Sequence, residues 1–105
     1  MTTADAIYDS IVTAMVGDSR VTQSKMFGSP GLKVNGKVFA VLVKGQLVVK
    51  LPRQRVDALV AAGQGEYFDP GMGRLMKEWV SVPVRAASIW PGLAKEALAF
   101  VGSGK

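Results

Sequence analysis

The sequence contains neither cysteine nor histidine. Without cysteine the chain can form no disulfide and offers no thiolate for catalysis. Without histidine it lacks the commonest general base and the commonest metal ligand. We therefore expect no zinc site, no Ser-His-Asp triad, no cofactor and no enzymatic activity.

Long apolar runs are also missing, because no segment approaches the roughly 18 consecutive apolar residues that span a bilayer. The start of the sequence, Met1 to Asp5, has no basic residue and no apolar stretch, so no signal peptide is expected. Together with the lack of cysteine, these features favour a cytoplasmic protein with no membrane contact.

The composition is that of one globular domain spanning residues 1–105, with 49% hydrophobic and 20% charged residues. The formal net charge of +5 favours contact with anions such as nucleic acid. A modest excess of lysine also serves solubility, so both interpretations stay open.

Residues 32–51 predict a three-stranded antiparallel meander. Asn35-Gly36 is the strongest short signal for a type I′ hairpin turn, and Lys44-Gly45 can form a second one. The runs on either side are rich in β-branched residues, as strands are.

With two-residue turns, Leu32 would pair with Phe39, Phe39 with Lys50 and Leu42 with Leu47. One face would then carry Val38, Ala40, Leu42, Leu47, Val49 and Leu51. The other would carry Leu32, Val34, Phe39, Val41, Val43 and Val48, interrupted by Lys37, Gln46 and Lys50. We expect helices on the first face, and a further element, a second copy or a ligand over part of the second.

Further patterns complete the expected fold. The apolar period from Ile7 to Met15 predicts an N-terminal helix, and further helices are expected to begin at Pro52 and near Ser88. Alternation in residues 79–84 predicts a fourth strand. The fold class is therefore α+β, with a central antiparallel β-meander and N-terminal, middle and C-terminal helices.

Residues 63–73 are rich in glycine and proline and predict a long ordered loop. Their glycine spacing completes neither a dinucleotide fingerprint nor a phosphate-binding loop. A pocket beneath this loop, with Tyr67, Arg74 and Trp79 in its wall, would make the chain a small-molecule-binding protein. That alternative stays open.

Basic residues gather at the Asn35-Gly36 end of the predicted sheet, beside Phe39. The candidate nucleic-acid or anion contacts are Lys33, Lys37, Lys50 and Arg53. Such a cluster can bind phosphates while an aromatic ring stacks on a base. Alternatively, the lysines only keep the rim of the sheet soluble and discourage aggregation.

A homodimer is an alternative of a different kind. Phe39, Val41 and Val48 share the second predicted face, and a second copy could bury them. The sequence thus predicts either a binding module or a structural protein that associates with itself through these residues.

Three separated segments resemble one family: Met26-Phe27-Gly28-Ser29-Pro30-Gly31-Leu32, then Gly36-Lys37-Val38-Phe39-Ala40, then Gly45-Gln46-Leu47-Val48-Val49-Lys50. They are similar to the N-terminal domain of the TfoX/Sxy competence-regulator family, which shows a Met-Phe-Gly-Gly start, a Gly-Lys-x-Phe-Ala hairpin and a Gly-x-Leu-x-x-Lys strand. Ser29 replaces the usual second glycine of the start. The resemblance implies a stand-alone α+β domain that regulates transcription through protein or nucleic-acid contacts. It carries over no catalytic residue.

Overall fold

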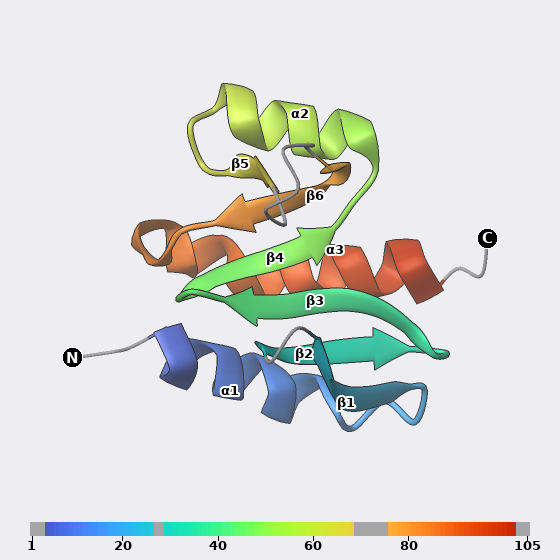
Figure 1. The fold of residues 1–105 in the computed structure, drawn as a ribbon. Helices are drawn as coiled ribbons and strands as arrows, with labels where there is room; N and C mark the ends of the chain where they lie inside the picture. The colour runs from blue at the N-terminus through green and yellow to red at the C-terminus, as the bar shows by residue number, and fades with distance from the viewer. Residues whose placement is uncertain (1–3, 27–28, 69–75, 103–105) are drawn as a thin grey trace.

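The computed structural model describes residues 4–26, 29–68 and 76–102. Within them the elements are α1 (Ala4–Met15), β1 (Val21–Met26), β2 (Ser29–Val34), β3 (Lys37–Val43), β4 (Gln46–Lys50), α2 (Arg53–Ala61), β5 (Glu66–Phe68), β6 (Met76–Val82), the 3-10 helix η1 (Val84–Ile89) and α3 (Trp90–Gly102). The strands form one antiparallel sheet in the order β1-β2-β3-β4-β6-β5. Figure 1 shows α3 crossing behind β3 and β4. The predicted α+β class is confirmed.

Both predicted tight turns are present. Asn35 and Gly36 have φ values of 52° and 81°, and Lys44 and Gly45 have values of 51° and 77°. Positive φ at both central residues characterises the type I′ turn, whose twist matches that of the strands it joins. The two turns therefore fold β2, β3 and β4 into the predicted meander.

The register between β2 and β3 differs from the prediction at Phe39. Leu32 pairs with Ala40 and Lys33 pairs with Val38, so Phe39 is an extra residue without a partner on β2. A bulge of this kind interrupts the alternation of side chains along the strand. Phe39 and Ala40 consequently both belong to the core beneath the helices. The predicted pairing of Leu32 with Phe39 is wrong.

Because of the bulge, several residues lie on the opposite side of the sheet from the one predicted. Leu32 and Val34 were expected on the side away from the helices, but both are fully buried in the core. Lys33 lies between them and therefore faces the other side, because neighbouring residues of a strand alternate. Its partner Val38 faces that side as well and leaves the predicted core face.

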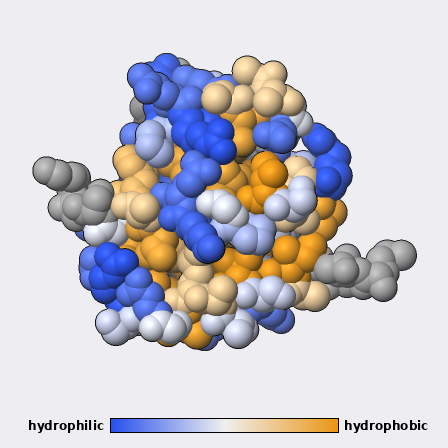
Figure 2. All heavy atoms as spheres, turned by 180° about the vertical axis from the view of Figure 1, so that it is seen from behind, coloured by the Kyte–Doolittle hydropathy of each residue, from blue (hydrophilic) through white to orange (hydrophobic). Residues whose placement is uncertain are grey.

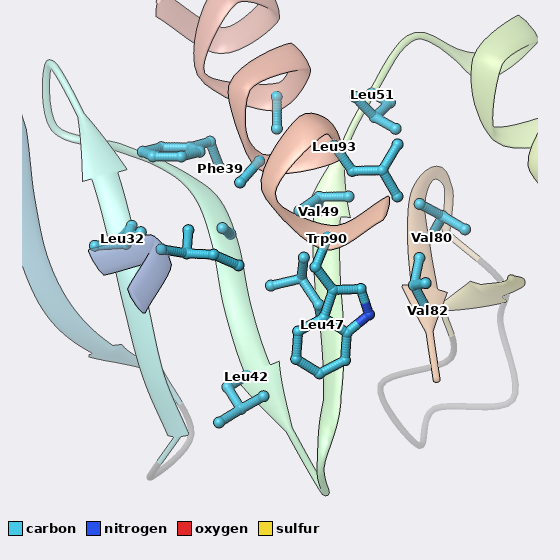
Figure 3. Packing of buried hydrophobic residues seen from close by; sticks show 14 of the residues in the cluster. Leu32, Phe39, Leu42, Leu47, Val49, Leu51, Val80, Val82, Trp90 and Leu93 are labelled. Carbon is cyan, nitrogen blue, oxygen red and sulfur yellow. The ribbon is translucent and has the colours of Figure 1, made fainter. Parts of the chain in front are cut away.

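One hydrophobic core fills the space between the sheet and the helices. It includes Tyr8, Ile11 and Met15 of α1, Val56 and Leu59 of α2, and Trp90, Leu93, Ala94 and Ala97 of α3. Figure 3 shows the labelled Trp90 and Leu93 of α3 beside Leu47 and Val49 of β4 and Val80 and Val82 of β6. All three helices are thus fixed to the same side of the sheet.

Several boundaries differ from the predictions. Pro52 is the N-cap of α2 rather than its first helical residue. The last helix begins at Trp90 instead of Ser88, because η1 precedes it and Ala86 inside η1 departs from helical geometry. The predicted loop contains β5, and its residues 69–73 lie outside the described residues. In the described ranges, no helix is long and apolar enough to cross a membrane.

Candidate nucleic-acid interface

The side of the sheet opposite the helices, here called the open face, carries a row of basic and aromatic side chains. Lys50 and Trp79 each neighbour core residues in their strands, so the alternation that places Lys33 on the open face places them there too. Lys33 pairs with Val38 across β2 and β3, and Lys50 pairs with Trp79 across β4 and β6. We call Lys33, Val38, Lys50 and Trp79 the basic row, and all of them are partly exposed.

Lys50 and Trp79 form a cation–π pair within this row. The ammonium nitrogen of Lys50 lies 5.9 Å from the centre of the Trp79 ring. A cation–π contact at an exposed site is worth about 0.5 to 1 kcal/mol, so the lysine can leave the ring at little cost. The aromatic residue beside the lysines is therefore Trp79 and not Phe39, which lies on the other side with no exposed surface.

Two of the predicted contact residues lie away from the open face. Lys37 pairs with Val34, whose side chain is in the core, so Lys37 is exposed on the side of the helices. Arg53 stands in the first turn of α2, where its Nε lies 4.0 Å from a carboxylate oxygen of Asp57. The structure thus brings together Lys33 and Lys50 of the predicted cluster, and separates Lys37 and Arg53 from them.

The three residues predicted for self-association are buried within one chain. Phe39, Val41 and Val48 are 0%, 7% and 1% exposed. Val41 and Val48 pair with each other across β3 and β4 on the open face, outside the core cluster. Side chains with so little exposed surface offer a second copy almost no apolar area to bury. These residues therefore cannot form the apolar interface that was predicted for a homodimer. Whether the chain forms a dimer in another way stays a prediction.

Polar groups border the middle of the open face. The hydroxyl of Ser81 on β6 donates a hydrogen bond to the side-chain carbonyl oxygen of Gln46 on β4. Glu66 pairs with Ser81 and therefore brings a carboxylate to the same face, on the edge strand β5. The Lys50–Trp79 pair of the basic row lies two residues farther along these strands.

Tyr67 and Trp79 do not frame the predicted pocket together. Tyr67 donates a hydrogen bond from its hydroxyl to Asp57 of α2, and this bond raises the pKa of the tyrosine. It pairs with the core residue Val80, so it lies on the opposite side from Trp79, while Arg74 lies outside the described residues. Tyr67 and Trp79 therefore cannot share a wall. In the described part of the chain, no three acidic residues could hold a metal ion together.

A small hollow lies on the helix side, between α1 and α3. Its volume is about 90 Å³, and its lining residues are Ser10, Ile11, Ala14, Met15, Pro91 and Lys95. Ligand pockets usually measure about 300 to 1,000 Å³, so this hollow is small for a cofactor. In Figure 2, which shows the molecule from behind, apolar surface is visible between polar side chains.

The pairing of β4 with β6 is what sequence reasoning missed. Trp79 and Ser81 alternate with the core residues Val80 and Val82, a pattern that marks one polar and one apolar side of a strand. That pattern could have placed Trp79 away from the core. The alternation within β6 cannot predict that Lys50 is the strand partner of Trp79, because β4 and β6 are separated in sequence by α2 and β5.

The comparisons with known proteins agree with the fold. The family model of the TfoX N-terminal domain matches residues 13–98, which span the chain from α1 into α3. No curated protein matches the chain. Because the match covers most of the sequence, the chain belongs to the TfoX N-terminal domain family.

Proposed function

We propose that this chain is a non-enzymatic, regulator-type binding module that contacts nucleic acid through the basic row of its open face. The observation that carries the proposal is that Lys33 and Lys50 share one face of the sheet with a partly exposed Trp79, which is the strand partner of Lys50. The family membership supports the regulator type. Lysines bind phosphates without regard to sequence, and an exposed aromatic ring adds contact with bases.

The ring beside Lys50 supports nucleic acid over an acidic protein as the partner. The chain carries a formal net charge of +5, which draws polyanions to it. Three arginines are already paired with carboxylates: Arg20 with Asp18, Arg53 with Asp57, and Arg55 with Glu96. The lysines of the basic row are not in any of these pairs, and Lys50 instead contacts a ring that a base could stack on.

The test is a titration of labelled oligonucleotides, single-stranded and duplex, at several salt concentrations. We expect binding that weakens with salt, and the double variant Lys33→Gln/Lys50→Gln should lower the slope of log K against log[salt] by about 1.4 to 1.8. That change corresponds to about 25- to 60-fold weaker binding at roughly 0.1 M salt if the proteins bind equally at 1 M.

Lys95→Gln is the matched control, since Lys95 is an exposed lysine of α3 on the other side of the molecule. It should leave both slope and affinity close to those of the unchanged protein. Equal losses in the double variant and in the control would contradict the proposed site. Absence of salt-dependent binding at low ionic strength would end the proposal.

A further inference from the structure

We infer that the nucleic acid is single-stranded and that Trp79 stacks on one of its bases. This inference rests on the proposed function and names the ligand of the same face. It comes from the shape of the face and from the position of one ring in it, neither of which follows from charge alone.

The open face is too wide for direct readout of a duplex. From β2 to β6 the basic row crosses four neighbouring strands, and strands lie about 4.8 Å apart, so Lys33 and Trp79 are separated by about 14 Å across the sheet. The major groove of B-DNA is only about 12 Å wide and admits a helix or a two-stranded ribbon. A sheet of this width can lie on the backbone of a duplex but cannot bring Trp79 to its bases.

A single strand removes this obstacle because its bases are unpaired, so one of them can turn out of the strand and meet a partly exposed ring on the sheet. Single-stranded nucleic acid is commonly bound by exposed aromatic rings on a β-sheet, with lysines along the backbone. Lys33 and Lys50 are two strands apart, or about 10 Å, and can therefore reach different phosphates. The basic row therefore offers these groups on one face of the sheet, with the ring beside Lys50.

Trp79 is available to a base at small cost. In the described part of the chain its ring has a cation–π contact with the flexible Lys50 side chain, whose ammonium nitrogen lies 5.9 Å from the ring centre. Base stacking on an aromatic ring is stronger than an exposed cation–π contact, so a base can displace the ammonium group. The displaced ammonium then lies beside the nucleotide, where it can bind a phosphate.

The two tryptophans of the chain allow a direct test. Trp90 is 0% exposed in the core, so a bound base can reach only Trp79. With a thymidine oligonucleotide of about 12 nucleotides, we expect tryptophan fluorescence to be quenched on binding. Trp79→Ala should weaken binding about 5- to 150-fold, the loss of one stacked base.

Trp79→Phe is the control for the possibility that Trp79→Ala weakens binding only because it unfolds the domain. Phenylalanine keeps a ring for stacking, so this variant should retain most of the affinity while the quenching disappears. Quenching that persists in Trp79→Phe, or an affinity unchanged in Trp79→Ala, would overturn the inference.

Duplex of the same length separates this inference from the proposed function. Tighter binding of the single strand supports the inference. Duplex binding as tight as single-strand binding, lost in Lys33→Gln/Lys50→Gln but unchanged in Trp79→Ala, overturns the inference and leaves nucleic-acid binding intact. Binding of neither form overturns both.

Discussion

Replacing Phe39 with alanine should lower the free energy of unfolding by about 3 to 5 kcal/mol, measured by urea denaturation. The bulge turns this ring into the core, where it has no exposed surface. Figure 3 shows Phe39 among the buried side chains on the side of α3. Removing the ring leaves a cavity beneath the helix that the surrounding β-sheet can close only in part. Total stability of a domain is typically about 5 to 15 kcal/mol, so the variant would lose a large share of it.

Val38→Ala is the neighbouring control. Val38 precedes Phe39 in β3, pairs with Lys33 and is only partly buried on the open face. Truncating it should cost less than about 1 kcal/mol, because little apolar area is lost and no enclosed cavity forms. Similar losses in the two variants would mean that the ring of Phe39 is not in the core.

Replacing Gly65 with alanine should destabilise the domain by about 1 to 3 kcal/mol. A Cβ atom at this position would lie 2.7 Å from Cγ2 of Val80 and 3.1 Å from the backbone oxygen of Ser81. Val80 is itself fully buried, and the Ser81 oxygen belongs to the central part of β6, so neither can retreat easily. The expected result is a lower midpoint in urea with an unchanged slope.

Gly92→Ala provides the contrast, because a Cβ atom there would meet nothing within 4 Å apart from its chain neighbours and the backbone of its own helix. Gly92 lies in α3, where alanine is the better helix former, so stability should stay the same or rise by up to about 1 kcal/mol. A loss in Gly92→Ala equal to that in Gly65→Ala would contradict the steric explanation.

The local features of the meander could be predicted from sequence because each depends on few residues. Asn35-Gly36 and Lys44-Gly45 both adopt positive φ, and each pair forms its own tight turn. The second turn sets the pairing of Val43 with Gln46 beside it. The bulge at Phe39 could not be predicted in the same way. A bulge depends on how β2 and β3 fit against the helices, and simple alternation describes only regular strands.

The candidate site was predictable only where it depends on local strand pairing. Lys33 and Lys50 lie in adjoining hairpins, so their common face follows from local pairing once the bulge is known. Trp79 joins them only because β6 pairs with β4 across an intervening helix and strand. The prediction that Arg53 lies beside these lysines is wrong. The extended strand ends before Pro52, and the chain continues into α2 from Arg53.

The most direct test of the central claim is an amide and indole NMR spectrum recorded while a single-stranded oligonucleotide is added. Our account predicts that the indole N–H signal of Trp79 moves together with the backbone signals of Lys33 and Lys50, while the indole signal of the enclosed Trp90 stays in place. Shifts confined to residues of α1 and α3 would place the contact on the helix side and contradict it.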